Sequence, residues 1–137
     1  MNAHADAWSH AQNVRMWVHQ AHNDLGTAAS PASSNTWFGR RARRATSKTS
    51  IDQAADALAQ ARLAWKDLAF WLHCAGYRNP QAPETLEEHF LVKQKGGNVA
   101  WEIEDVFVKA KREVLQQDLA MLDKLIAFLD AKQRASA

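Results

Sequence analysis

The stretch IDQAADALAQARLAWKDLAFWLHCA, from Ile51 to Ala75, carries the clearest structural information in the sequence. Its apolar residues recur at alternating steps of three and four: Ile51, Ala54, Leu58, Ala61, Trp65, Leu68, Leu72 and Ala75. This spacing places them on one side of a single α-helix. A continuous apolar side needs other helices to cover it, so the stretch predicts an all-α protein whose helices share one core.

Length and composition agree with a helical protein of one domain. The chain has 137 residues, a length that suits one core. Apolar residues make up 47% and charged residues 23%, which argues against general disorder, and only 5 Gly and 3 Pro argue against a turn-rich β fold. We therefore expect a single helical-bundle domain over residues 1–137.

The same spacing and the capping residues predict three long helices and one short helix. We place them at 6–25, 50–77, 84–95 and 98–132, with Gly26 as the first stop and Ser50 and Asn98 as N-caps. We expect an antiparallel bundle, with a flexible basic linker over residues 27–50 after the first helix.

The linker contains a dense cluster of cations beside two aromatic residues. They are Trp37, Phe38, Arg40, Arg41, Arg43, Arg44 and Lys48. The rest of the chain holds 12 basic and 15 acidic residues, so the basic arm extends from a mildly acidic body. The arm is open to four interpretations: a solvated or self-docked linker, an acidic protein partner, an anionic membrane surface, or a nucleic acid whose phosphates and bases meet arginine and aromatic side chains.

The outward side of the second helix changes character along its length. It begins with acidic and amide residues, but its last third is apolar nearly all round. Such a helix is either covered by the short helix and the Trp37–Phe38 segment or presents an interface. We assign a partner-binding surface to Leu63, Phe70, Trp71, Cys74, Trp101, Val108 and Leu115.

The last predicted helix has two apolar stripes with a charged row between them. Glu104, Lys111 and Asp118 are seven residues apart and therefore line up along the helix. Charges within an apolar arc need partners, and we consider Arg15, Arg62 and His73 for that role. We interpret the row as a structural ion network rather than as a catalytic site.

The residues that would carry catalysis or bind a metal do not form a convincing set. His19 and His22 share a helix side, but no Glu-x-x-His pair and no Cys/His quartet occurs, so we predict no metal and no cofactor. The one cysteine lies on an apolar stretch, where a reactive thiolate is disfavoured. We predict no catalytic residue.

One spacing resembles a known family of enzymes. Arg15 and His22 are similar to the Arg-x4–6-His pair of the small helical HEPN ribonucleases. That resemblance implies an arginine that holds phosphate and a histidine that transfers protons during RNA cleavage.

The sequence thus predicts a non-enzymatic interaction or adaptor protein that self-associates or binds a protein partner through apolar helix faces. The first alternative is a nucleic-acid-binding accessory protein that uses the basic arm, and the second is a HEPN-like ribonuclease. The N-terminus lacks the pattern of a secretory signal, and no apolar run reaches the length of a membrane span. We expect a cytoplasmic location.

Overall fold

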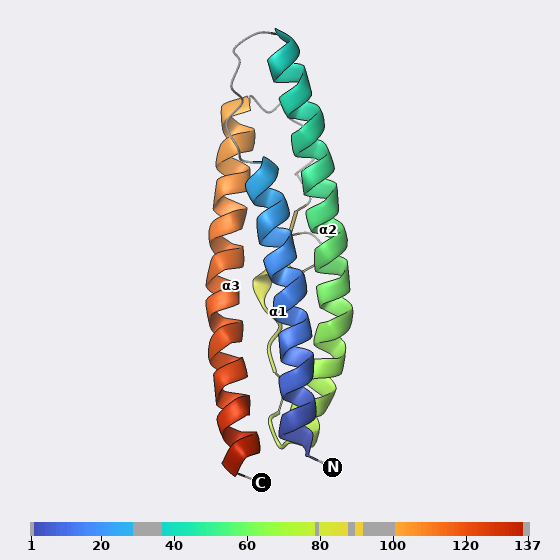
Figure 1. The fold of residues 1–137 in the computed structure, drawn as a ribbon, viewed down its shortest axis with the longest axis vertical. Helices are drawn as coiled ribbons and strands as arrows, with labels where there is room; N and C mark the ends of the chain where they lie inside the picture. Colours follow the sequence, from blue (N-terminus) through green and yellow to red (C-terminus); the bar gives the residue numbers. More distant parts are fainter. Residues whose placement is uncertain (1, 29–36, 79, 88–89, 92–100, 136–137) are drawn as a thin grey trace.

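The computed structural model describes residues 2–28, 37–78, 80–87, 90–91 and 101–135, and their side chains outside 27–28, 37–49 and 101–107. These residues form three long α-helices and one short 3-10 helix (Figure 1). They are α1 (Ala3–Ala28), α2 (Trp37–Cys74), η1 (Glu84–Leu86) and α3 (Trp101–Ala135). The described part of the chain contains no strand, which confirms the all-α class.

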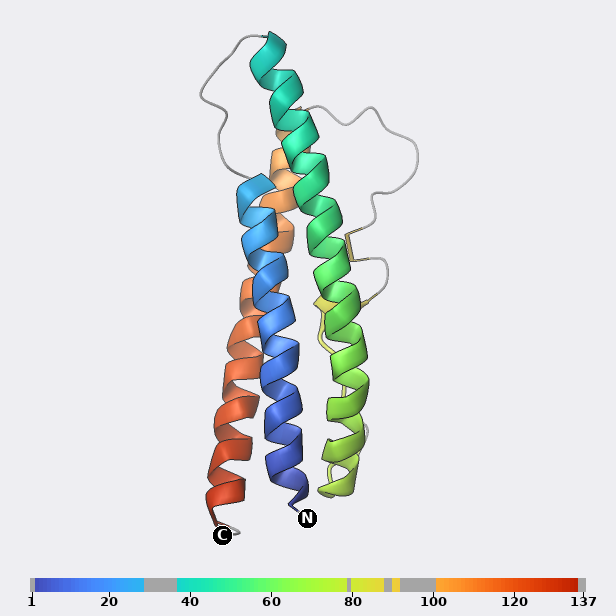
Figure 2. The same cartoon turned by 45° about the vertical axis from the view of Figure 1, so that its right-hand side comes forward.

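The three long helices lie alongside one another, with α1 in contact with both α2 and α3 (Figures 1 and 2). The chain direction is opposite in α1 to that in α2 and α3, which run the same way (Figure 1). We expected a short helix over 84–95 between α2 and α3, but among the described residues of this connection only η1 is helical, and η1 contacts both α2 and α3. The return segment, which we define as residues 80–87 and 90–91, thus fills the space between α2 and α3.

Alanine and leucine residues of the predicted seam form the core. From Ile51 to Ala75, the seam residues Ala54, Leu58, Ala61, Leu68 and Leu72 are buried, and Ile51 and Trp65 pack against the core. In α1, Ala7, Ala11, Val14, Val18, Ala21 and Leu25 are fully buried. Small side chains at these positions allow α1 and α2 to approach closely.

Helix α2 is longer at its N-terminal end than we predicted. It begins at Trp37, so the backbone of 37–49 is helical where we expected a linker, and Ser50 lies within the helix instead of capping it. Residues 29–36 lie outside the described residues. The sequence did not predict this longer helix because the residues around Ser50 are small and polar, and such residues favour caps and turns in the absence of tertiary contacts.

The C-terminal end of α2 is set by Gly76. Gly76 has φ of +99°, and its N–H donates to the His73 carbonyl at 3.0 Å. The Tyr77 N–H donates to the Leu72 carbonyl at 2.9 Å. Together these bonds form a Schellman motif, in which glycine adopts the left-handed conformation at little cost.

Gly26 does not end α1, which continues to Ala28. A Cβ added at Gly26 would lie 3.0 Å from a terminal nitrogen of Arg112 on α3. The glycine is therefore used for the close approach of an arginine side chain, a role that sequence spacing alone does not reveal.

The prediction of a short helix over 84–95 is wrong at Glu87, directly after Leu86. Glu87 has extended backbone, with φ −66° and ψ 139°, which ends η1 after three residues. Residues 88–89 and 92–95 lie outside the described residues, as does the predicted cap Asn98 of the last helix.

Candidate interaction surface

Two large apolar side chains lie on the outward side of α2, opposite its buried seam. Leu63 is 57% exposed and Phe70 is 59% exposed. They are seven residues apart, so they follow one line along the helix, and the exposed Cys74 extends that line by one more turn. We call Leu63, Phe70 and Cys74 the outer stripe of α2.

Trp71 anchors the outer stripe to the core. Its side chain is half-buried and packs against the core cluster. The rings of Phe70 and Trp71 meet edge to face, with centroids 5.3 Å apart and an interplanar angle of 77°. This contact limits the motion of Phe70, so little entropy is lost if a partner covers the ring.

Two of the predicted partner-binding residues lie inside the bundle and not on its surface. Val108 is 3% exposed and Leu115 is fully buried, so both belong to the core, and their assignment to a partner surface is corrected. They belong to the stripe of α3 that also contains the buried Leu119, Leu122 and Leu129. The side chain of Trp101 lies outside the described residues.

Opposite charges flank the outer stripe. Lys66 and Asp67 are both exposed, and successive residues differ by about 100° around a helix. Phe70 therefore lies between them, with Lys66 along one edge and Asp67 along the other. The apolar residues were predicted from the sequence and this flanking pair was not, although Lys66 and Asp67 follow Leu63 by three and four residues and precede Phe70 by four and three.

The charged row of α3 contacts the return segment. The Thr85 N–H donates to Asp118 Oδ2 at 3.1 Å, and Lys111 Nζ lies 4.5 Å from the centroid of the Phe90 ring. Neither contact involves the predicted partners Arg15, Arg62 or His73. Asp118 accepts a hydrogen bond from a backbone N–H, and Lys111 makes a cation–π contact with the Phe90 ring. These two charged side chains therefore hold the return segment against α3. The side chain of Glu104 lies outside the described residues.

The Arg15–His22 pair lies along the contact between α1 and α3. Arg15 Nε donates to Asp123 Oδ1, which ties the two helices together. Burial lowers the pKa of His22 below its ordinary value of 6.5, and the positive charges of Arg112 and His19 lower it further. A HEPN-like site needs its arginine for phosphate, whereas this guanidinium is engaged by a carboxylate.

No group of three or more His, Cys, Asp or Glu side chains in the described residues is placed to hold a metal ion. His4 instead joins a packed cluster at one end of the bundle, where its Nε2 lies 3.1 Å from the Tyr77 hydroxyl. The Tyr77 ring also meets Phe128 edge to face at 5.6 Å, so this cluster links α1 and α3 to the segment that directly follows α2.

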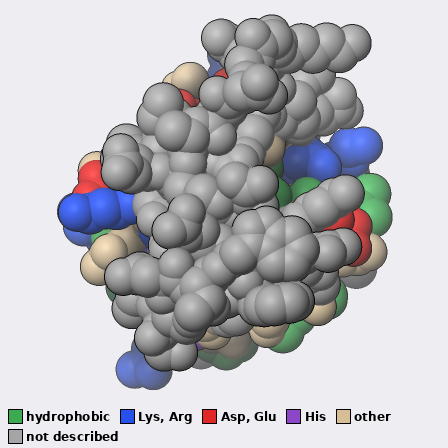
Figure 3. All heavy atoms as spheres, turned by 90° about the horizontal axis from the view of Figure 1, so that it is seen from above, with side chains coloured by type: hydrophobic (Ala, Val, Ile, Leu, Met, Phe, Trp, Pro, Cys, Tyr) green, Lys and Arg blue, Asp and Glu red, His purple; other side chains and the backbone are tan. Residues whose placement is uncertain are grey.

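The basic residues of the predicted arm belong to the first turns of α2. They are Arg40, Arg41, Arg43, Arg44 and Lys48, and with Trp37 and Phe38 their side chains lie outside the described set. Figure 3 looks onto this end of the molecule. Lys or Arg and Asp or Glu side chains of the described residues are visible together at its left edge and again at its right edge.

Comparisons with models of known families, with curated proteins and with solved structures each found no match. In the described part of the chain, no helix has the length and apolar content that crossing a membrane requires.

Proposed function

We propose that this chain is a non-enzymatic interaction protein that self-associates through the outer stripe of α2. The observation that carries the proposal is the exposure of Leu63 and Phe70 on one line of a helix whose opposite side is fully packed. Covering the exposed part of such a side chain stabilises a complex by about 1 kcal/mol. The bundle supports the proposal because α1 covers the inner side of α2 and leaves the outer stripe in solvent.

The flanking charges favour a second copy of the same chain as the partner. When two copies of α2 lie parallel and are related by a two-fold axis, the left edge of the stripe in one copy meets the right edge of the stripe in the other copy. Lys66 would then pair with Asp67 of the second copy, and Asp67 with its Lys66. Leu63, Phe70 and Cys74 would each meet their own equivalents along the seam.

The same arrangement limits how far the contact extends. Asp52 and Asp56 are exposed nearer the start of α2 and lie on the same outward side as Leu63. A parallel pair would bring these carboxylates towards their equivalents, which is unfavourable. The contact is therefore confined to about residues 59–74, roughly 22 Å of helix at 1.5 Å per residue. Because this area is small, we propose a weak and reversible dimer.

A reducing compartment such as the cytoplasm is part of this proposal. There Cys74 stays a thiol, so that the dimer is held by packing and charge and not by a disulfide.

Sedimentation equilibrium of the wild-type chain tests the proposal. We expect a monomer–dimer equilibrium in the micromolar to millimolar range that Phe70→Glu shifts to monomer, with an unchanged helical circular dichroism spectrum. Met16→Glu is the matched control, since Met16 is 52% exposed on α1 and lies away from the outer stripe. A wild-type chain that stays monomeric throughout this range would refute self-association.

A second candidate function is nucleic-acid binding, and the helical start of α2 favours it. Arg40, Arg44 and Lys48 recur every four residues within this helix, which aligns their positions along one side. A row of cations suits a phosphate backbone. Replacing the four arginines by alanine would then abolish binding to single-stranded RNA, and the wild-type affinity would fall steeply with salt. Affinity that is unchanged in the variant excludes this function for the basic segment.

A further inference from the structure

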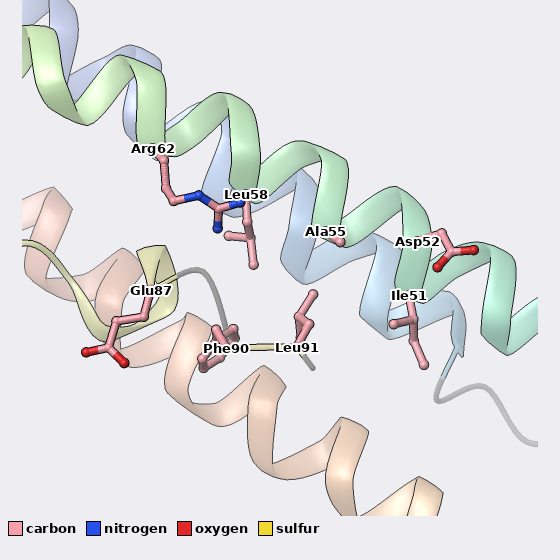
Figure 4. Close-up of a pocket in the computed structure, with 8 residues that line it drawn as sticks. All are labelled: Ile51, Asp52, Ala55, Leu58, Arg62, Glu87, Phe90 and Leu91. Carbon is pink, nitrogen blue, oxygen red and sulfur yellow. The ribbon is translucent and has the colours of Figure 1, made fainter. Parts of the chain in front are cut away.

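A pocket of about 220 Å³ lies between α2 and the return segment (Figure 4). Its apolar lining comes from Ile51, Ala55 and Leu58 of α2 and from Phe90 and Leu91 opposite them. Its polar lining consists of Asp52, Arg62 and Glu87. The pocket is on a different side of α2 from the outer stripe, and no residue of the stripe lines it.

The polar residues of the pocket point in different directions. The guanidinium of Arg62 points into the space between α2 and the Phe90–Leu91 pair, whereas the carboxylates of Asp52 and Glu87 point away from it (Figure 4). Within the described residues, no hydrogen bond or ion pair involves Arg62. Arg62 is partly buried beside apolar side chains, which shield its charge from part of the solvent. An anion in the pocket would therefore interact with this cation more strongly than with a fully exposed one.

We propose that this pocket binds a small organic monoanion with an apolar body, of which aromatic and short-chain monocarboxylates are the simplest members. The carboxylate accepts two parallel hydrogen bonds from the Arg62 guanidinium, a geometry that this side chain provides and lysine does not. The apolar body lies against Leu58, Phe90 and Leu91. The volume is below that of pockets for drug-sized molecules, so it selects a small ligand.

The wall opposite α2 is fixed rather than free to collapse onto Arg62. Phe90 is 6% exposed, and Lys111 on α3 lies over its ring at 4.5 Å. The hydrogen bond from Thr85 to Asp118 holds the preceding turn of the return segment on the same helix. The pocket is thus formed by the fold itself and pre-organised for a ligand.

The carboxylates of Asp52 and Glu87 make the pocket selective for the charge of its ligand. Asp52 and Glu87 place negative charge near its ends, and a ligand with a second negative charge would be repelled by one of them. We therefore expect benzoate and hexanoate to bind, and terephthalate and inorganic phosphate to bind much more weakly.

The test is a titration of the full wild-type chain with benzoate and with benzamide, its uncharged counterpart, followed by NMR shifts of Leu58 and Leu91 methyl groups. We expect saturable benzoate binding that is at least about tenfold tighter than benzamide binding, because a charged pair is lost with the amide. This comparison needs no variant, so it does not depend on the folding of one. Equal affinities for the two compounds, or no saturable binding of benzoate or hexanoate, would overturn the proposal.

Two variants locate the site. Arg62→Gln should weaken benzoate binding by at least about tenfold, whereas Lys124→Gln, which removes an exposed cation of α3 outside the pocket lining, should leave it unchanged. Equal losses in both variants would show a nonspecific charge effect and would contradict the assignment. The site is independent of the dimer proposed above, and Phe70→Glu should bind benzoate as the wild type does.

Discussion

The outward sides of α1 and α2 differ although their buried sides follow the same pattern. The exposed residues of α1 after its first turn are polar apart from Met16: Ser9, Gln12, Asn13, His19, Gln20 and Asn23. The outward side of α2 instead exposes Leu63 and Phe70 in line. A helix that serves only the core needs just its seam to be apolar, and the proposed self-association therefore rests on the second apolar line of α2.

The largest expected effect separates the two sides of α2 by stability. Leu68 is fully buried and Leu63 is 57% exposed on the same helix. Leu68→Ala should lower the free energy of unfolding by about 2–5 kcal/mol, because it removes buried surface and leaves a cavity. Leu63→Ala should change it by less than about 0.5 kcal/mol. Urea unfolding of both variants checks the difference, and similar losses would show that Leu63 belongs to the core.

A smaller effect tests the charges at the edges of the outer stripe. Lys66→Glu should weaken self-association several-fold, since a pair of this kind is worth about 0.2–1 kcal/mol and the change also introduces repulsion. Adding Asp67→Lys to that variant exchanges the two signs and should restore the affinity. Sedimentation equilibrium of the single and double variants measures both steps. A double variant weaker than the single one would contradict the parallel arrangement.

The contact between α1 and α3 should depend only weakly on its ion pair. Arg15 and Asp123 are 38% and 55% exposed in their side chains, so solvent screens the pair. Asp123→Asn should lower the free energy of unfolding by about 1 kcal/mol or less. Self-association should not change, because this pair is not part of the outer stripe. If urea unfolding shows that the free energy of unfolding falls by several kcal/mol, the pair contributes far more to the contact between α1 and α3 than expected here.

The smallest effect concerns pH. The pKa of His22 is lower in the folded chain than its ordinary value of 6.5, chiefly because of burial. Below about pH 6.5 the unfolded chain therefore binds this proton more readily than the folded chain, and stability falls as pH decreases towards the lowered pKa. His22→Gln should reduce the loss of stability between about pH 7.5 and pH 5.5. Identical pH profiles for wild type and His22→Gln would contradict this assignment.

The sequence predicted the elements that depend on local spacing. The seam of α2 and that of α1 were evident from alternating steps of three and four, and their leucines and alanines are buried as expected. Leu63, Phe70 and Cys74 were likewise expected to face outward, and they are exposed. Periodicity identifies such residues because the angle between successive residues is fixed once a helix forms.

Features that depend on distant parts of the chain were missed. Asp118 meets Thr85, and Arg62 faces Phe90 and Leu91, only because the return segment passes between α2 and α3 in a largely non-helical form. The Schellman motif at Gly76 was not predicted from the sequence. Val108 and Leu115 were placed on a partner surface because α3 has two apolar stripes, and spacing alone does not say which of them is covered.

Oxidative cross-linking at Cys74 tests the central claim most directly. In a parallel dimer through the outer stripe, Cys74 lies near its equivalent, and a disulfide requires Cβ atoms about 3.5–4.5 Å apart. Treating the wild-type chain with a mild oxidant should therefore give a covalent dimer that dithiothreitol reverses, and Cys74→Ser and Phe70→Glu should both abolish it. A wild-type chain that remains monomeric under these conditions, or a Phe70→Glu variant that cross-links equally well, would contradict the account.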